Sequence, residues 1–254
     1  MRVLITGASS GIGREFALQY AAAGHDLVLV ARNVERLHAL AADVHSQFGV
    51  DAQVLAADLS NRAQLTIVEE RLRSDSAPID LLVNNAGFGT TTSFGTADLH
   101  REQEMLEVLV VAVMRLTAAA LPNMIKRRSG GVIVVSSVAG WMPGGTYSAA
   151  KAWATTFVES IAGELRKTGV SAMALCPGFT VTEFHERAGI EREAVPRFLW
   201  LDVRDVVASA IRDYSRGKVV CTPSLRYKAL GLFMRTLPRW IWRALNVGLS
   251  GPRR

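Results

Sequence analysis

The sequence predicts one α/β domain built on a doubly wound parallel sheet, with helices layered on both faces of the sheet. Three observations support this prediction. Short runs rich in β-branched residues alternate with longer helix-like stretches, several runs are apolar almost throughout, and no repeat or low-complexity linker interrupts residues 1–225. Apolar runs suit parallel strands covered on both faces, and regular alternation is typical of βαβ units with right-handed crossovers. We therefore expect a three-layer αβα single domain of the Rossmann type.

The expected elements follow one another in order along the chain. Strands are expected at Val3–Thr6, Asp26–Ala31, Ala52–Ala56, Leu81–Asn84, Gly131–Ser137 and Ser171–Cys176, with a seventh at Val219–Thr222. Helices are expected at about 12–24, 33–47, 61–74, 98–127, 147–168 and 203–215. Ser60 and Asp202 precede the third and the last of these helices, and their side-chain oxygens suit an N-cap.

Composition excludes several classes of protein. The chain is 49% hydrophobic and 20% charged, as is usual for a globular protein. Its two cysteines, Cys176 and Cys221, lie far apart, which predicts neither a metal site nor a disulfide and favours a reduced cytoplasmic setting. The chain start lacks the long apolar stretch of a secretory signal. The longest unbroken apolar run, Val108–Met114, has seven residues, so we expect no membrane-spanning helix.

The positive charge is concentrated at the C-terminal end. The formal net charge is +6, yet residues 226–254 hold seven basic residues and no acidic ones. Residues 1–225 therefore hold 22 basic and 23 acidic residues, a net charge of −1. The excess positive charge therefore carries information about the partners of the tail only, and not about those of residues 1–225. No recognition motif accompanies it, so nucleic acid is not an expected partner.

A glycine-rich turn follows the first expected strand. In Thr6–Gly13, Gly7 permits a tight turn, Gly11 lets the backbone approach a pyrophosphate, and Gly13 lets helix and strand pack closely. The N–H groups at the start of the following helix favour phosphate. The motif predicts dinucleotide binding; the alternative is a turn with a purely structural use.

The residue directly after the second expected strand is Arg32 rather than an acidic residue. An Asp or Glu there would bind both ribose hydroxyls of NAD, whereas a guanidinium donates charge-assisted hydrogen bonds to the 2′-phosphate of NADP. We therefore expect NADP(H), with Arg14 as a weaker second contact. The alternative is a surface arginine at the start of a helix.

Further motifs follow the later strands, and together they give a resemblance that runs from Arg2 to about Phe184. The sequence resembles the short-chain dehydrogenase/reductase family in six motifs, each at the C-terminal end of a strand or in the following helix: Thr6–Gly13, Asp58-Leu59, Asn84–Gly87, Ser136-Ser137, Tyr147–Lys151 and Pro177-Gly178.

The resemblance implies the catalytic residues. In this family the tyrosine of Tyr-x-x-x-Lys gives or takes a proton while nicotinamide gives or takes a hydride. Tyr147 is then the general acid/base, and Ser137 binds the substrate oxygen. A free tyrosine has a pKa of ~10, and Lys151, on the same helix face, is expected to lower it and to bind ribose. Read alone, Tyr147 and Lys151 would be an ordinary helical pair.

The resemblance also implies the cofactor contacts. Asp58 would hold the adenine amine, Asn85–Gly87 would line the ribose, and the residues after Pro177 would lie against the nicotinamide amide and the phosphates. The expected cofactor-binding residues are Gly7, Ser9, Ser10, Gly11, Ile12, Gly13, Arg32, Asp58, Leu59, Asn85, Ala86, Gly87, Tyr147, Lys151, Pro177, Gly178, Thr180 and Thr182; no metal ligand is expected. For Asp58 and Asn85 the alternative is a turn-forming role.

Two features depart from the family pattern. Leu109 occupies the position of an asparagine that holds the backbone open for a proton-relay water. Ser137 precedes Tyr147 by ten positions, about three fewer than usual, so the loop 141–146 is short. The leading hypothesis is an NADP(H)-dependent oxidoreductase acting on a carbonyl or alcohol. The alternative is an NADP-binding protein with weakened or lost catalysis that acts as a sensor or scaffold.

The C-terminal part concerns substrate and partners. Bulky residues such as Phe179, Phe184 and Trp200 suit an apolar substrate (fatty-acyl, steroid or similar), although they are also ordinary core material. We expect residues 1–225 to form the NADP-binding catalytic domain and residues 226–254 a basic amphipathic extension with helices at about 226–235 and 238–247. Three interpretations of the extension stay open: a lid or dimer element, an anchor at the inner membrane surface, or a disordered tail. A homo-oligomer, dimer or tetramer, is also expected.

Overall fold

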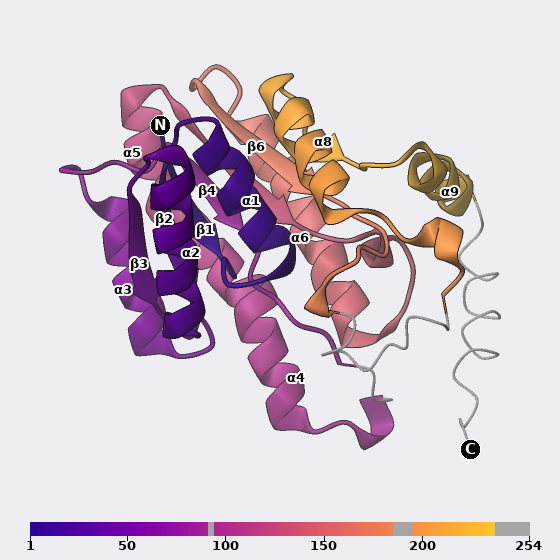
Figure 1. Cartoon of the computed structure of the whole chain (residues 1–254). Coiled ribbons are helices and arrows are strands. Elements are labelled where there is room, and N and C mark those ends of the chain that lie inside the picture. The colour runs from indigo at the N-terminus through magenta and orange to yellow at the C-terminus, as the bar shows by residue number, and fades with distance from the viewer. Residues whose placement is uncertain (91–93, 185–194, 237–254) are drawn as a thin grey trace.

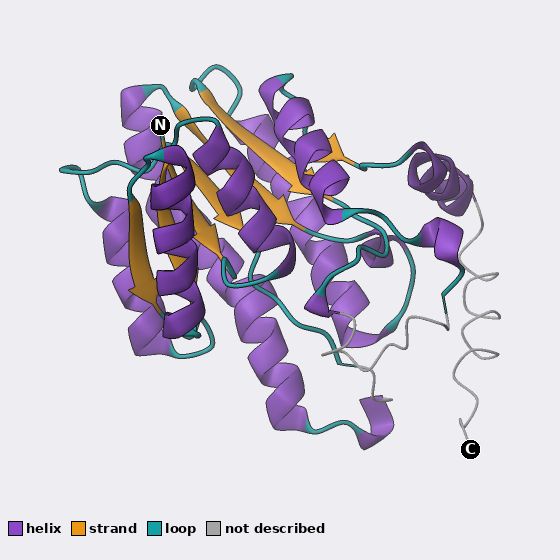
Figure 2. Cartoon of the chain, in the orientation of Figure 1, coloured by secondary structure: helices purple, strands orange, loops and turns teal. Residues whose placement is uncertain are grey.

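The computed structural model describes residues 1–90, 94–184 and 195–236 and contains a seven-stranded sheet between two layers of helices (Figures 1 and 2). The strand order is β3-β2-β1-β4-β5-β6-β7, and every neighbouring pair is parallel. This confirms the predicted Rossmann-type fold class. The strands are β1 (Arg2–Thr6), β2 (Asp26–Ala31), β3 (Ala52–Ala56), β4 (Leu81–Asn84), β5 (Gly130–Val135), β6 (Val170–Leu175) and β7 (Val220–Cys221).

The strands bury side chains on both faces, as their nearly continuous apolar sequences require. Successive side chains of a strand point to opposite faces, so β1 places Val3 and Ile5 on one side and Leu4 on the other. The first side packs against α1 (Gly11–Ala22), α2 (Val34–Phe48) and α8 (Val203–Ser215). The second packs against α3 (Arg62–Arg73), α5 (Val113–Arg127) and α6 (Gly145–Glu164). Each fully buried Val, Leu or Ile stabilises this arrangement by roughly 1.5–3 kcal/mol.

A long helix runs from Leu99 to Arg127, where one helix was predicted at 98–127. It consists of α4 (Leu99–Leu106), a π-helical segment η2 (Glu107–Ala112) and α5. By length and composition this helix is long and apolar enough to cross a membrane, so the expectation that no segment qualifies was wrong. That expectation considered unbroken apolar runs only. Half of the apolar window is buried inside the protein, which is typical of a core helix.

One of the two predicted N-caps, Asp202, is confirmed, and the other, Ser60, is wrong. Asp202 caps α8, because its carboxylate accepts the N–H of Arg204 at 2.7 Å. Ser60 was the wrong choice for α3. The cap is Asn61, whose side chain accepts two N–H groups of the first turn, while the Ser60 hydroxyl donates to Asp58 at 2.7 Å. Both residues precede the helix, and Asn is as good an N-cap as Ser.

The C-terminal part of the described chain is the helix α9 (Leu225–Thr236), close to the first tail helix expected at 226–235. The second expected tail helix, at 238–247, lies outside the described residues. Short 3₁₀ turns lie at η1 (Phe94–Thr96), η3 (Val138–Trp141) and η5 (Arg197–Leu199). The boundary at residue 225 stays a prediction.

Candidate active site

The candidate site lies where the strand order reverses, between β1 and β4. In open parallel sheets, ligands bind beyond the carboxyl ends of the strands at this point. The two strand ends are tied together directly. The Thr6 hydroxyl accepts the N–H groups of Asn85 and Ala86 at 2.9 and 3.0 Å, and the Asn85 side-chain amide donates to the Thr6 carbonyl at 2.9 Å.

The glycines of the first turn have the close contacts that the sequence predicts. Gly7 and Gly11 have φ of +66° and +54°, in the left-handed region that favours glycine. A Cβ on Gly13 would lie 2.3 Å from the Gly7 carbonyl oxygen, so any side chain there would push α1 away from β1. Ser10 begins the helix without a side-chain cap hydrogen bond, which leaves first-turn N–H groups for an anionic ligand.

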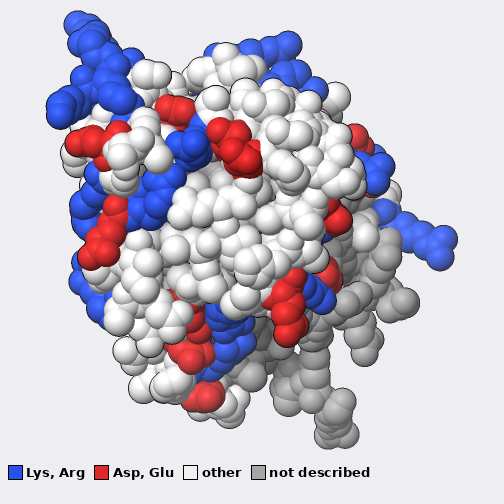
Figure 3. All heavy atoms as spheres, turned by 60° about the vertical axis from the view of Figure 1, so that its left-hand side comes forward, with Lys and Arg blue, Asp and Glu red and all other residues white. Residues whose placement is uncertain are grey.

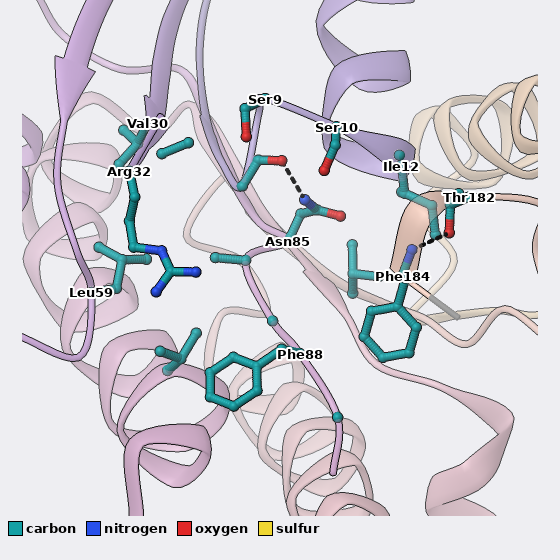
Figure 4. Close-up of a pocket in the computed structure, with 18 of the residues that line it drawn as sticks. Ser9, Ser10, Ile12, Val30, Arg32, Leu59, Asn85, Phe88, Thr182 and Phe184 are labelled. Carbon is teal, nitrogen blue, oxygen red and sulfur yellow. Dashed lines mark hydrogen bonds between the residues drawn. The ribbon is translucent and has the colours of Figure 1, made fainter. Parts of the chain in front are cut away.

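A cavity of about 700 Å³ extends from this turn. Figure 4 shows Arg32 and Leu59 on one side, Thr182 and Phe184 on the other, and Ser9, Ser10 and Asn85 between them. Every residue predicted to bind cofactor or act in catalysis lines the cavity except Gly13, which lies behind the turn, and Arg14, the weaker second contact. The predicted residues that line it are Gly7, Ser9, Ser10, Gly11, Ile12, Arg32, Asp58, Leu59, Asn85, Ala86, Gly87, Ser137, Tyr147, Lys151, Pro177, Gly178, Thr180 and Thr182.

At one end of the cavity, Arg32 and Asp58 form an ion pair of 3.6 Å. Burial opposes ionisation of Asp58, but hydrogen bonds from Ser60 and the charge of Arg32 outweigh it and lower the pKa of this carboxyl. The Arg32 side chain is 67% exposed, so its guanidinium is accessible to a phosphate. Arg14 is not among the lining residues; it pairs with Asp43 at 3.8 Å.

At the other end, the short loop still brings Ser137 and Tyr147 to the same cavity. The turn η3 begins directly after Ser137, and α6 begins at Gly145, two residues before Tyr147 and earlier than predicted. Ser137 Oγ accepts the N–H of Ala139 at 3.1 Å, which leaves the hydroxyl proton available to donate. The loop is therefore short without separating the two side chains.

Burial dominates the protonation of Tyr147. It raises the pKa of Tyr147 to about 12, while a hydrogen bond with Ser137 acts in the opposite direction. The lowering by Lys151 that the sequence predicts is not seen in this structure. The ammonium of Lys151 lies 5.6 Å from the centre of the tyrosine ring.

Lys151 is buried and held by the backbone. Its ammonium donates to the Val135 carbonyl at 2.7 Å, and burial lowers the pKa of Lys151 to about 8, with Cys176 acting in the opposite direction. The network behind it is polar: Ser136 Oγ donates to the Lys151 carbonyl and pairs with Thr155, both at 2.7 Å. This network fixes α6 against the end of β5.

Leu109 lies in the π-helical segment and is 2% exposed. It packs with Met105 and Ala150, and a Cβ on Gly87 would come within 2.7 Å of its side chain. The relay asparagine of the family is thus replaced by an apolar contact against Gly87. The Leu109 side chain cannot hold a relay water.

These residues fit a nicotinamide dinucleotide. The turn with free first-turn N–H groups suits a pyrophosphate, and Arg32 and Asp58 suit an adenosine end. The cavity continues to the Ser137–Tyr147–Lys151 end, where the reactive ring would lie. Within the described parts of the chain, no group of three His, Cys, Asp or Glu side chains is placed to hold a metal ion.

Comparison with known proteins identifies the family. The model of the short chain dehydrogenases matches residues 1–193. The chain belongs to the short-chain dehydrogenase family. A solved short-chain dehydrogenase from Sphingobium yanoikuyae, in complex with NADPH, is 36% identical, with a TM-score of 0.85, and the match covers 94% of this chain and 96% of that one. The resemblance predicted from the motifs is confirmed.

Two further proteins are similar to this short-chain dehydrogenase. A bulky-bulky ketone specific alcohol dehydrogenase from Comamonas testosteroni is 30% identical, with a TM-score of 0.81 and coverage of 94% and 95% of the two chains. A very-long-chain 3-oxoacyl-CoA reductase of Phaeosphaeria nodorum is 34% identical over 66% of this chain and 51% of its own length. The chain spans 51–60% of the length of three curated relatives that it matches.

Several lining residues of this short-chain dehydrogenase were not predicted. Arg101 stacks over the ring of Phe88 at 4.1 Å, and Arg36 pairs with Glu183 at 2.9 Å across to the segment after β6. Arg36, Phe88, Arg101 and Phe184 all line the cavity. Phe88 directly follows the Asn84–Gly87 motif and could have been included. The two arginines belong to no motif, and only the fold brings them to the cavity.

Lys151 makes the stability of the protein depend on pH. The unfolded chain titrates this lysine near its ordinary pKa of 10.5 and the folded chain at about 8. Between these values the unfolded chain binds more protons, so stability rises with pH. Relative to Lys151→Met, the unmodified protein is expected to gain roughly 2–3 kcal/mol of unfolding free energy from pH 8 to pH 10. Urea unfolding at several pH values measures this gain, and parallel curves for the two proteins would contradict it.

Proposed function

We propose that this short-chain dehydrogenase transfers a hydride between NADP(H) and the carbonyl or alcohol carbon of an apolar substrate. The observation that carries the proposal is one continuous cavity with Arg32 at one end and Ser137, Tyr147 and Lys151 at the other. NADPH in the solved relative from Sphingobium yanoikuyae supports the choice of cofactor. Arg32, directly after β2, where an acidic residue would favour NAD, supports it independently.

The roles of the side chains follow from their donors and charges. The reduced cofactor supplies the hydride. The hydroxyl of Tyr147 gives its proton to the substrate oxygen in reduction and takes it back in oxidation. Ser137 donates its hydroxyl proton to the same oxygen and positions it. Burial opposes ionisation of Tyr147 and the hydrogen bond with Ser137 favours it. Lys151, whose ammonium lies 5.6 Å from the centre of the tyrosine ring, is therefore assigned to bind the ribose of the cofactor.

The substrate end of the cavity is aromatic. The rings of Tyr147 and Phe184 lie 5.9 Å apart, and Phe88 lines the cavity nearby. Aromatic walls favour a bulky apolar carbonyl compound, such as a fatty-acyl or steroid ketone. The similarity to a bulky-bulky ketone specific alcohol dehydrogenase and to very-long-chain 3-oxoacyl-CoA reductases supports this class.

Cofactor preference is the first test. Arg32→Ala is expected to weaken NADPH binding by about 1.5–3 kcal/mol, the range for a hydrogen bond to a charged group, and to leave NADH binding nearly unchanged. Quenching of protein fluorescence measures both dissociation constants. Arg14→Ala is a matched control, because Arg14 pairs with Asp43 and does not line the cavity. Equal affinities of the unmodified protein for NADH and NADPH would refute the assignment.

Turnover is the second test. Tyr147→Phe removes only the proton route, so it is expected to reduce turnover of a bulky ketone by about 10²–10⁴-fold while NADPH still binds. The loss of NADPH absorbance at about 340 nm measures the rate of turnover of a panel of ketones, aldehydes and acyl thioesters. A variant that keeps most of its rate would overturn the role of Tyr147. Binding without turnover of any substrate by the unmodified protein would favour the sensor or scaffold instead.

We also propose a homo-oligomer, a dimer or tetramer. The exposed side chains of Leu106, Met114 and Ile125 form apolar surface along the long helix and support a second copy as partner. Light scattering after size exclusion measures the mass in solution.

Figure 3 shows a face on which acidic and basic side chains are interspersed, without the continuous basic surface that nucleic acid would need.

We also propose that the protein is cytoplasmic and contacts the inner membrane surface through its C-terminal part. On α9, Leu225 and Phe233 are 81% and 60% exposed beside the basic Arg226 and Lys228. Such a surface favours anionic lipid, at ~1 kcal/mol per basic residue. The protein is expected to sediment with phosphatidylserine vesicles at low salt, to be released at high salt, and to ignore phosphatidylcholine vesicles. No sedimentation at low salt would remove this proposal.

A further inference from the structure

The C-terminal helix α9 inserts one side chain, Tyr227, behind the wall of the active site. Tyr227 is 3% exposed. Its hydroxyl accepts the N–H of Phe179 at 3.1 Å and donates to the Leu199 carbonyl at 2.8 Å. The single hydroxyl therefore uses its proton and a lone pair to join two backbone segments that are twenty residues apart in sequence.

The ring of Tyr227 lies directly against Gly178. A Cβ on Gly178 would come within 2.0–2.5 Å of three atoms of the ring, so this position has no room for a side chain. Gly178 and its neighbour Pro177 line the cavity. The backbone at Gly178 therefore separates the cavity from the ring of Tyr227, with no side chain between them.

The two segments joined by the hydroxyl also pair with each other. The Leu201 N–H donates to the Phe179 carbonyl at 2.8 Å, and the Val181 N–H donates to the Leu201 carbonyl at 3.0 Å. Thr180 and Leu201 form an isolated parallel bridge. Tyr227 adds one further connection at the start of this pair, beside Gly178, and holds the wall at a fixed distance from α9.

The same helix supports the other side of the site. A Cβ on Gly231 would lie 2.6–3.1 Å from the indole ring of Trp141, so α9 packs closely on that ring. Trp141 ends the turn η3, which begins directly after Ser137. The helix α9 therefore contacts both segments that follow the central strands β5 and β6, one carrying Ser137 and the other carrying Pro177 and Gly178.

We propose that Tyr227 is a positioning residue of the active site, whose hydroxyl fixes the Pro177–Phe179 backbone relative to Ser137 and Tyr147. It does not reach the cavity itself, and it lies outside residues 1–193, which match the family. The effect on the placement of cofactor and substrate rests on the proposed function. The clamp, by which we mean the two hydrogen bonds of the Tyr227 hydroxyl to Phe179 and Leu199, does not depend on that function.

The test begins with amide hydrogen exchange of the protein without cofactor. In the unmodified protein the Phe179 amide is expected to exchange as slowly as amides of the central strands. Tyr227→Phe keeps the ring against Gly178 and removes only the hydroxyl, so exchange in residues 177–182 is expected to rise about tenfold. Fast exchange of Phe179 in the unmodified protein, or unchanged exchange in the variant, would overturn the clamp.

The control is Tyr20→Phe. Tyr20 is also 3% exposed, and its buried hydroxyl has no hydrogen-bond partner among the described residues, so its loss should leave residues 177–182 unaffected. Thermal unfolding of the two variants compares their stability directly. A general loosening of the fold would raise exchange in the central strands as well, which would contradict a local role for Tyr227.

The second readout is kinetic. With NADPH and a bulky ketone, Tyr227→Phe is expected to lower kcat about three- to tenfold and to change KM less than twofold, because binding groups stay while their alignment is lost. Unchanged kcat together with raised exchange would show a structural role only and would overturn the proposal. If the unmodified protein turned over no carbonyl compound, the proposed function would fail, while hydrogen exchange would still test the clamp.

Discussion

The active site depends on the contact between the ends of β1 and β4. The hydroxyl and carbonyl of Thr6 and the amide of Asn85 join the two strand ends at the point where the sheet reverses its order. With these ends fixed, α1 rests on the Gly7 carbonyl, because Gly13 carries no side chain. The position of the helix N-terminus over the cavity follows from this contact.

Burial sets the resting protonation states of Tyr147 and Lys151. It raises the pKa of Tyr147 and lowers that of Lys151, so both side chains are held toward their neutral forms. Leu109 contributes to this environment by packing an apolar side chain against Gly87, close to the lysine. Burial therefore opposes ionisation of the tyrosine. The hydrogen bond with Ser137 favours the ionised form and offsets part of this effect.

Much of the fold and of the site could be predicted from local sequence, because each motif lies at the end of a strand or in the following helix and parallel strand ends meet at one edge. Gly7, Ser9–Ile12 and Asn85–Gly87 reached the cavity for this reason, and Tyr147 reached it from the helix that follows β5. Other features depend on tertiary contacts. Arg36 and Arg101 reach the cavity only through the packing of their helices, and the π-helical segment at Leu109 leaves no pattern in the sequence. Asn61 was missed as a cap because Ser60 beside it suits the same role.

The close packing of Trp141 on Gly231 joins two parts of the chain that are ninety residues apart in sequence. The indole ring occupies the space that any side chain at position 231 would need. A large residue in the loop after Ser137 and a glycine in the C-terminal helix therefore form a matched pair. Among relatives, a larger residue at position 231 would require a smaller one at position 141, so the loop after Ser137 and the C-terminal helix are expected to change together.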